Sequence, residues 1–350
     1  MPAIEILGSG RIDDRESAFP QAVQLPDGDI LCSYGVGGGP IASGGTDWSR
    51  STDGGESWTL EGTVLPPTTD PDTTNFLKLT LSPDGGTVYA YGSRSYRKPG
   101  APKQRDEPVF CRSTDAGRSW TAPQVVPLPT NDPLEISHGM LALSSGRLMA
   151  PAARFPEGRL GEQVLAAISD DGGGTWPTHA VVFQDPNDRF GYLEQKLAEL
   201  APGRLIATCW TATLSDVEDQ TDRFAISNDD GATWGPPVST GIRAQTMTPI
   251  PLGGDRLLVL YNRRYGEQGI VMALVTYTEE AWDVHHESVM FDARVTRDQT
   301  ESDGGRDEWN NFEFGFPAAI RLQDGTYLAT HWSREAGKFG IRWTRLRVEF

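Results

Sequence analysis

The chain has 350 residues and a formal net charge of −17, from 48 acidic and 31 basic side chains. A field of this sign repels nucleic acid and anionic membrane surfaces, so we expect neither as a partner. No apolar stretch approaches the roughly 20 residues that span a bilayer. The three cysteines form no CxxC motif and the five histidines show no metal-ligand spacing, so we expect no zinc site and no other cofactor.

The N-terminal residues 1–6 (MPAIEI) contain neither a basic nor an apolar segment, so they do not resemble a signal peptide. If the chain is complete, we expect a cytoplasmic protein. A leader that had been removed would leave the same N-terminus.

The first predicted elements are two short β-strands, and they recur. Residues 19–34 contain an apolar strand, a Pro-Asp-Gly turn and a second apolar strand. Five similar segments follow, and they begin at Phe76, His138, Leu193, Met247 and Phe316. No helical periodicity accompanies them, so we expect an all-β chain.

A turn motif follows each of the first four segments. Its pattern is Ser-x-Asp-x-Gly-x-Ser/Thr-Trp, at residues 51–58, 113–120, 169–176 and 227–234. The Asp side chain accepts hydrogen bonds within its own turn, the Gly adopts a backbone angle that other residues avoid, and the Trp covers the turn. We therefore interpret the motif as a structural hairpin staple.

The spacing of the staples predicts the number of repeats. Their aspartates are 62, 56 and 58 residues apart, so a chain of 350 residues holds six units. The fifth staple has decayed to residues 277–282, and the last unit ends in a strand at 341–348 with no room for a fourth. Residues 4–8 can supply that strand and close the ring. We predict one domain, residues 1–350, folded as a six-bladed β-propeller.

The four staples resemble the Asp boxes of the sialidase-like superfamily (neuraminidases, BNR Asp-box repeats), and the resemblance covers essentially the whole chain. It implies a glycoside hydrolase with three arginines that grip a carboxylate, a Tyr–Glu nucleophile pair and an Asp acid/base. Glu194 and Glu199 match glutamates of the family, and Glu199 aligns with the one that would activate the tyrosine. Asp47 lies roughly where the acid/base loop would be.

The sequence departs from that pattern at several positions. The first arginine is replaced by residues 18–20 (AFP), another by Trp210, and the tyrosine by Phe316, while the third arginine corresponds to Arg263 or Arg264. A phenyl ring has no oxygen with which to attack an anomeric carbon. We therefore expect a divergent member that lacks the arginine triad and the tyrosine nucleophile, without a true sialidase mechanism.

The second strands of four repeats end in arginine, at Arg94, Arg154, Arg263 and Arg334. In an acidic chain, such a ring at the mouth of the propeller suits an anionic ligand such as a uronic acid, a sulfated sugar or a phosphate. The alternative is that each arginine pairs with a local carboxylate.

Candidates for acid/base chemistry lie where the inner strands begin. Glu194 and Glu199 are five residues apart in a strand, so we expect them on opposite sides, with Glu194 facing the centre. His138 is a candidate base or a hydrogen-bonded structural residue. Asp47 is a candidate acid/base or a turn former.

Other side chains on the same face suit contacts with sugar hydroxyls or stacking on sugar rings. These candidates are Asp188, Arg189, Asn310, Asn311, Glu313, Trp210 and Trp332.

Three functions stay open at the level of sequence. The first is a carbohydrate-active enzyme on an anionic glycan, by hydrolysis with two carboxylates about 5–10 Å apart or by elimination with His138 as the base. The second is a non-catalytic propeller that binds glycans or proteins. The third is an exo-sialidase or uronate lyase with rearranged catalytic residues.

Overall fold

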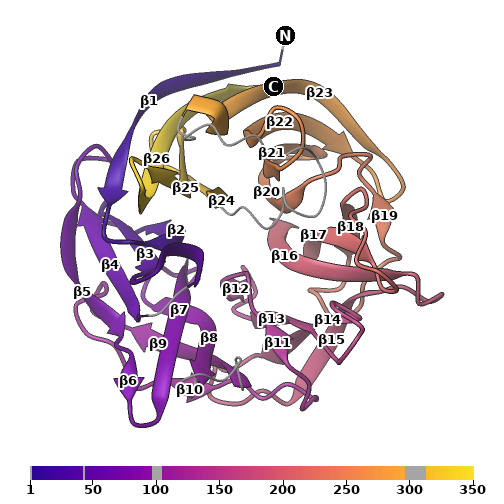
Figure 1. Cartoon of the computed structure of the whole chain (residues 1–350), viewed down its shortest axis with the longest axis horizontal. Helices are drawn as coiled ribbons and strands as arrows, with labels where there is room; N and C mark the ends of the chain where they lie inside the picture. Colours follow the sequence, from indigo (N-terminus) through magenta and orange to yellow (C-terminus); the bar gives the residue numbers. More distant parts are fainter. Residues whose placement is uncertain (1, 42–43, 97–104, 296–312) are drawn as a thin grey trace.

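The computed structural model describes residues 2–41, 44–96, 105–295 and 313–350. Six β-sheets surround a common axis in chain order (Figure 1). The predicted six-bladed β-propeller is therefore confirmed. No helix in the described part of the chain is long and apolar enough to cross a membrane.

The strands of the first three blades follow one another along the chain and pair in antiparallel fashion. Each pairs with the next, except that β11 and β12 of blade 3 both pair with β13. Blade 1 contains β2 (Ala18–Gln24), β3 (Ile30–Gly35), β4 (Thr46–Ser51) and β5 (Thr59–Leu65). Blade 2 contains β6 (Thr68–Thr69), β7 (Asp72–Leu81), β8 (Val88–Tyr96), β9 (Arg105–Ser113) and β10 (Gln124–Val125). Blade 3 contains β11 (Leu134–Glu135), β12 (Leu141–Ala142), β13 (Leu148–Arg154), β14 (Gln163–Ser169) and β15 (Thr178–Gln184).

The remaining blades have four strands each. Blade 4 contains β16 (Phe190–Ala201), β17 (Arg204–Thr213), β18 (Arg223–Ser227) and β19 (Val238–Ser239). Blade 5 contains β20 (Gln245–Gly253), β21 (Arg256–Arg263), β22 (Gly269–Tyr277) and β23 (Trp282–Asp292). Blade 6 contains β24 (Phe314–Arg321), β25 (Tyr327–Glu335), β26 (Lys338–Glu349) and β1 (Ala3–Asp13). Two short 3₁₀ turns, η1 (Gly39–Ile41) and η2 (Ala293–Val295), complete the described elements.

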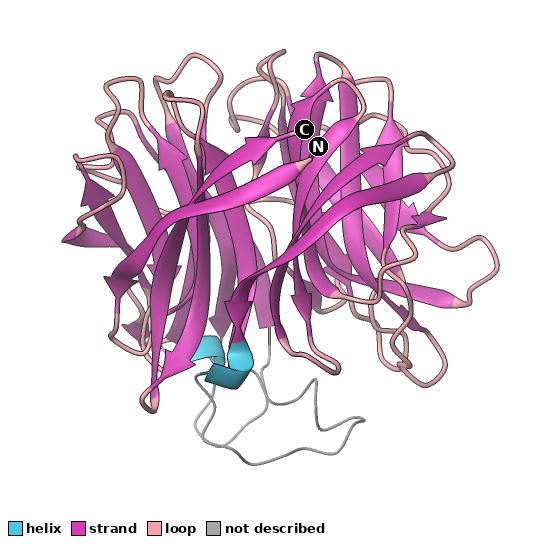
Figure 2. Ribbon diagram, turned by 90° about the horizontal axis from the view of Figure 1, so that it is seen from above, coloured by secondary structure: helices cyan, strands magenta, loops and turns pink. Residues whose placement is uncertain are grey.

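The N-terminal strand closes the ring, as predicted. β1 pairs antiparallel with β26, from Ala3 opposite Glu349 to Asp13 opposite Ile341. The two termini consequently lie side by side (Figure 2). This pairing covers the edge of β26 that would otherwise expose unpaired backbone groups.

The staples hold the turns that lead into the last strand of each of the first four blades, β5, β10, β15 and β19. In the second one, the Asp115 carboxylate accepts hydrogen bonds from the Ser113 hydroxyl at 2.7 Å and from the backbone N–H of Ser119 at 2.9 Å. In the first, the indole N–H of Trp58 donates to the carbonyl of Gly55 at 2.9 Å. The motif is thus the hairpin staple that the sequence predicted.

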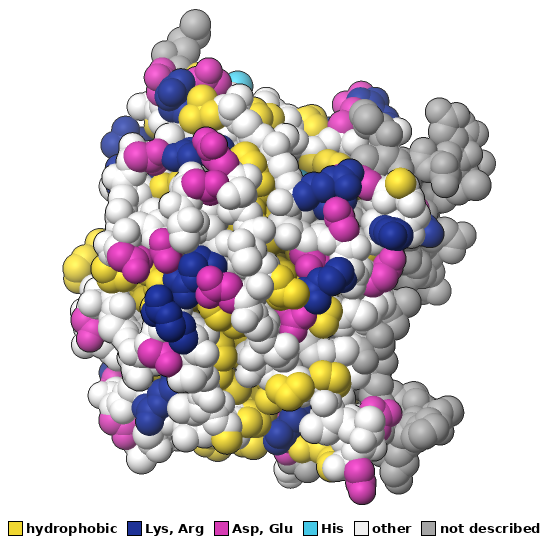
Figure 3. Space-filling view, turned by 90° about the vertical axis from the view of Figure 1, so that its left-hand side faces the viewer, with side chains coloured by type: hydrophobic (Ala, Val, Ile, Leu, Met, Phe, Trp, Pro, Cys, Tyr) yellow, Lys and Arg dark blue, Asp and Glu magenta, His cyan; other side chains and the backbone are white. Residues whose placement is uncertain are grey.

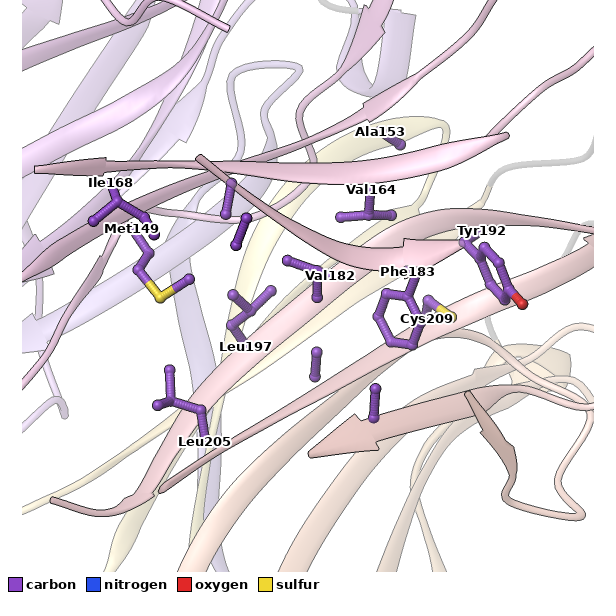
Figure 4. Close-up of a cluster of buried hydrophobic side chains, with 14 of the residues drawn as sticks. Met149, Ala153, Val164, Ile168, Val182, Phe183, Tyr192, Leu197, Leu205 and Cys209 are labelled. Carbon is purple, nitrogen blue, oxygen red and sulfur yellow. The ribbon is translucent and has the colours of Figure 1, made fainter. Parts of the chain in front are cut away.

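Apolar side chains form the core between neighbouring blades. Figure 4 shows one such cluster, in which Met149 and Phe183 of blade 3 pack against Tyr192 and Leu205 of blade 4. The rings of Phe183 and Tyr192 are stacked with centroids 5.2 Å apart. Each large side chain buried in this way contributes roughly 1.5–3 kcal/mol. The blades therefore support one another through their faces, which leaves the inner strands free to present polar side chains at the axis.

Candidate active site at the propeller axis

Four of the inner strands begin with the same irregularity. β2, β16, β20 and β24 each carry a shift of register, and within each shift one non-glycine residue has a positive φ angle. These residues are Phe19 (φ 59°), Glu194 (φ 49°), Thr246 (φ 53°) and Phe316 (φ 53°). Such conformations cost about 1–3 kcal/mol each and concentrate at functional sites. The four strained bulges therefore indicate that the functional site lies at this end of the propeller axis.

The inner strand of blade 3 is interrupted instead. Both β11 and β12 pair with β13, and residues 136–140 between them leave the ladder. Glu135 is the last residue of β11, opposite Ala153. The interruption therefore brings a carboxylate to the axis at the edge of an irregular segment.

Glu135 and Glu194 come from neighbouring blades and meet at this point. The backbone N–H of Glu194 donates a 3.0 Å hydrogen bond to the Glu135 carboxylate, and both residues remain partly exposed. Burial, and then the negative charge of Glu194, raise the pKa of Glu135 to about 7. Burial also raises the pKa of Glu194, while the positive charges of Lys196 and Arg264 oppose that rise. The pair thus contains one carboxyl poised to carry a proton near neutral pH.

Two buried lysines lie beside the glutamates. Lys78 of β7 donates to the carbonyl of Ile136 at 2.7 Å, and Lys196 of β16 donates to the carbonyl of Ser137 at 2.6 Å. The Lys196 ammonium also lies 3.3 Å from the centroid of the Phe316 ring. Burial lowers the pKa of Lys78 to about 7, and burial with the charge of Lys78 lowers that of Lys196. We call Lys78, Glu135, Glu194 and Lys196 the axial cluster.

Phe316 contacts the axial cluster through Lys196 and belongs to a group of aromatic rings. It is buried, and its ring meets that of Phe19 edge to face at 5.7 Å, while Phe19 stacks on Phe76 at 5.0 Å. Phe19 and Phe76 are partly exposed. The side of the axis formed by blades 1, 2 and 6 is therefore aromatic, and that formed by blades 3 and 4 carries the carboxylates.

Of the arginines at the fifth blade, Arg264 is the one near the cluster. Its guanidinium donates to the Gln245 side chain at 3.1 Å and lies over the Phe314 ring at 4.3 Å. Its charge acts on Glu194. Arg263 instead points to Glu287 at 3.4 Å.

The structure does not bring Glu199 or Asp47 to Glu194. The Glu199 carboxylate accepts hydrogen bonds from the backbone N–H and the hydroxyl of Ser144, at 2.8 and 2.6 Å, on a turn of blade 3. Five residues of strand separate it from Glu194, which is about 16 Å. Asp47 lies in β4 and binds Arg15 at 3.0 Å and Thr63 at 2.7 Å. Both carboxylates are engaged in structural contacts.

His138 lies in the wall of an axial cavity. The cavity has a volume of about 280 Å³ and is lined by His138, Lys196, Thr80 and mainly apolar side chains. The Nδ1 atom of His138 lies 2.5 Å from the carbonyl oxygen of Gly139. Burial, together with the charge of Lys196, lowers the pKa of this imidazole to about 3, so His138 is neutral.

The arginines at the ends of the second strands each lie against a carboxylate. The pairs are Arg94 with Glu107 at 2.6 Å, Arg154 with Asp132 at 2.5 Å, Arg263 with Glu287 at 3.4 Å and Arg334 with Glu313 at 3.7 Å. Basic and acidic side chains are similarly interspersed on the outer surface (Figure 3). The four arginines therefore add little net positive charge.

The other candidates are distributed around the rim. The Trp210 indole donates to Asp219 and packs on Leu193, while Trp332 is buried against Phe19. Asp188 pairs with Arg159 at 3.1 Å, and Arg189 with Asp185 at 3.4 Å. Asn310 and Asn311 lie outside the described residues.

Sequence reasoning passed over three of the four members of the axial cluster. Lys78 is the single charge in the apolar segment FLKLTL, a pattern that is detectable because a lysine is seldom buried unless it is paired. Lys196 lies in the segment LEQKLAEL between Glu194 and Glu199, where its charge is less conspicuous. Glu135 left no comparable signal, because the break in its strand is not visible in the sequence.

Comparison with known proteins agrees with this architecture. Residues 48–329 match the BNR repeat-like domain family. The chain belongs to this family. A sialidase from Micromonospora viridifaciens is 26% identical over 281 residues, which are 69% of this chain and 41% of the relative. The chain thus spans about two fifths of the length of the curated relative that it matches.

Solved structures with the same propeller support the fold of this BNR repeat-like protein. A protein of unknown function from Dyadobacter fermentans superposes with a TM-score of 0.75, at 21% identity and full coverage of both chains. An α-L-arabinanase from Penicillium chrysogenum, in complex with arabinobiose, gives 0.64 at 16% identity, over 97% of this chain and 98% of the other. The fold is the sialidase-like propeller, which this chain shares with a sialidase and with an arabinanase.

Proposed function

We propose that this protein is a glycoside hydrolase in which Glu194 is the nucleophile and Glu135 is the general acid/base. The observation that carries this proposal is the hydrogen bond between the Glu194 N–H and the Glu135 carboxylate, which joins two partly exposed glutamates at the axis. Most glycoside hydrolases use two carboxyl groups, one on either side of the bond that is cleaved.

The environments of Glu135 and Glu194 differ, and this difference supports the roles of acid and nucleophile proposed for them. Because the pKa of Glu135 is raised to about 7, this carboxyl holds a proton near neutral pH while one of its oxygens accepts the Glu194 N–H. The positive charges of Lys196 and Arg264 favour the ionised form of Glu194. Two carboxyls whose environments differ in this way divide into an acid and a nucleophile.

The reaction then has two steps. The Glu194 carboxylate attacks the anomeric carbon, the bond to the leaving oxygen breaks, and that oxygen takes the proton of Glu135. Water next attacks the glycosyl ester, giving a proton to Glu135 and releasing Glu194. The anomeric configuration is retained, and Phe316 takes no part as a nucleophile because its ring carries no hydroxyl.

The substrate is a glycan, and we keep an anionic glycan as part of the proposal. Its support is the positive charge of Arg264 beside Glu194, since the four arginines at the strand ends already lie against carboxylates. Elimination with His138 as the base has less support, because His138 is buried and its pKa is lowered to about 3, which makes its imidazole a weak base.

The test is a panel of aryl glycosides and polysaccharides, assayed with purified wild type, Glu135→Gln and Glu194→Gln. The panel includes sialosides and α-L-arabinofuranosides, since the relatives are a sialidase and an arabinanase, together with uronides and neutral hexosides. We expect turnover by the wild type and its loss in both variants.

Glu199→Gln is the matched control, since this carboxylate binds Ser144 at the far end of the same strand. Its activity should equal that of the wild type. Full activity in Glu135→Gln and Glu194→Gln would refute the proposal. Glycan binding by the wild type without turnover would replace it with a binding function.

A further inference from the structure

The interrupted inner strand of blade 3 leaves backbone carbonyls that no neighbouring strand satisfies. Residues 136–140 separate β11 from β12, and a carbonyl at the axis needs another donor when it leaves the ladder. Lys78 supplies one for Ile136, and Lys196 supplies one for Ser137. Blades 2 and 4 thus hold the broken strand of blade 3 from both sides.

Charged side chains are an expensive choice for this purpose. Lys78 is 0% exposed and Lys196 is 2% exposed, and burying an ammonium costs several kcal/mol unless it is well paired. Elsewhere at the axis, neutral side chains donate the same kind of hydrogen bond to a backbone carbonyl, which we call a tie. Thr80 donates to the carbonyl of Met140, and Thr248 donates to that of Pro317 at 2.6 Å. The need for a donor to each carbonyl therefore does not by itself explain why both donors are lysines.

The lysines are joined closely to both glutamates. Ile136 and Ser137 directly follow Glu135, so the two ties fix the main chain that carries its side chain. Lys196 lies two residues after Glu194, beyond the bulge that aims Glu194 at the axis. The Phe316 ring, 3.3 Å from the Lys196 ammonium, limits its movement on the remaining side.

We propose that Lys78 and Lys196 are positioning residues, which hold Glu135 against Glu194 by tying the interrupted strand of blade 3 to both neighbouring blades. This inference rests on the proposed function of the two glutamates. The lysines do not touch substrate. They act through the position of Glu135 and through the charge that they place beside the pair.

The positive charges of Lys78 and Lys196 also affect the pKa values of the two glutamates, which a neutral hydrogen-bond donor would not do. The charged groups that act on the two glutamates are Lys78, Lys196 and Arg264. The glutamates in turn act on Asp222 and Tyr91, and the two lysines act on His138. Removing one ammonium from this set destabilises the ionised form of both carboxyls, so their pKa values rise. Both limbs of the pH–rate profile then move to higher pH.

The test compares Lys78→Met and Lys196→Met with Thr80→Val, which removes a neutral tie to the same segment. We expect kcat/KM to fall on the order of 100-fold in each lysine variant, as when a reacting group is misplaced by about 1 Å. Both limbs of the profile should shift upward. In Thr80→Val the limbs should stay in place.

A second measurement needs no substrate. Amide hydrogen exchange of residues 134–142 should accelerate in Lys78→Met and Lys196→Met, relative to wild type, while exchange in blades 5 and 6 is unchanged. If one lysine variant does not fold, the other provides both readouts.

The outcomes separate this inference from the proposed function. Lost activity with unchanged pH limbs and unchanged exchange in 134–142 would overturn the positioning role, even if Glu135→Gln and Glu194→Gln are inactive. Full activity of those two glutamine variants would overturn the proposed function, even if the lysine variants show faster exchange.

Discussion

The backbone N–H of Glu194 lies 3.0 Å from a carboxylate oxygen of Glu135, across the boundary between blades 4 and 3. A main-chain donor is held by its strand, so it orients the carboxylate without the freedom of a side chain. Because Glu194 has a positive φ angle, the bulge that aims its side chain at the axis also turns its N–H toward Glu135. One local distortion therefore arranges both carboxyl groups.

The first prediction concerns pH. Glu135 must be protonated to donate to the leaving group, and its pKa is about 7, so activity should fall as pH rises through about 7. On the acid side, activity should fall when Glu194 takes up a proton. A profile of kcat/KM against pH for an aryl glycoside that the enzyme accepts should be bell-shaped. Constant activity from pH 7 to 9 would contradict the role of Glu135.

The second prediction separates the acid from the nucleophile. Glu135→Gln should lose on the order of 10²–10⁴-fold in rate on glycosides with poor leaving groups, since general acid catalysis is worth that much. The loss should be much smaller for a dinitrophenyl glycoside, whose leaving group needs no proton. Glu194→Gln should be inactive on both substrates. Equal losses for Glu135→Gln on the two leaving groups would show that it is not the acid.

Sequence reasoning was sufficient for the fold because the fold repeats. Four staples at regular spacing determine the blade count, and a missing last strand identifies residues 4–8 as its replacement. The site at the axis could not be predicted in the same way, because its residues lie where the inner strands depart from the regular repeat. Alternation within β16 predicted opposite sides for Glu194 and Glu199, but a bulge between Leu193 and Lys196 breaks that alternation. The two residues are separated chiefly by their positions along the strand.

The partners of Glu194 were not predictable for a related reason. Glu135 reaches it only because the inner strand of blade 3 stops after two residues, and Lys78 stabilises that break from another blade. These contacts join positions 58 and 59 residues apart, and no local pattern encodes them. By contrast, the arginines at the ends of the second strands have their carboxylate partners on neighbouring segments, as in the alternative reading of the sequence.

The third prediction concerns the staples at low pH. Hydrogen bonds within the turn, chiefly from the Ser119 hydroxyl, lower the pKa of Asp115 from 3.8 to about 2. Those from the Thr175 backbone N–H and hydroxyl do the same for Asp171. A carboxyl with a lowered pKa in the folded state stabilises the fold above its unfolded pKa, and this stability is lost as pH falls from about 4 to 2.

The double variant Asp115→Asn, Asp171→Asn tests this. Its Tm at pH 7 should lie below that of the wild type, and its Tm should decrease less between pH 4 and 2. Asp283→Asn, at an exposed position of β23, is the control and should follow the wild-type curve. Parallel curves for the double variant and the wild type would show that the staple carboxylates do not drive acid unfolding.

The fourth prediction concerns the strand that closes the ring, where two glycines face the same tryptophan. A Cβ added at Gly10 would lie 2.7 Å from Nε1 of Trp343, whereas one added at Gly8 would lie 3.8 Å from the same indole. Trp343 is largely buried on β26, so its ring has little room to move. Gly10→Ala should therefore be destabilising by about 1–3 kcal/mol, the usual cost of overpacking.

Gly8→Ala provides the matched control on the same strand. Its Cβ makes an ordinary contact, and alanine restricts the unfolded chain, so the free energy of unfolding should be unchanged or higher by up to about 1 kcal/mol. Denaturant unfolding of the two variants gives the comparison directly. Equal stabilities would mean that β1 shifts away from Trp343 at little cost, and that the closure of the ring depends on the backbone ladder with β26 rather than on packing against the indole.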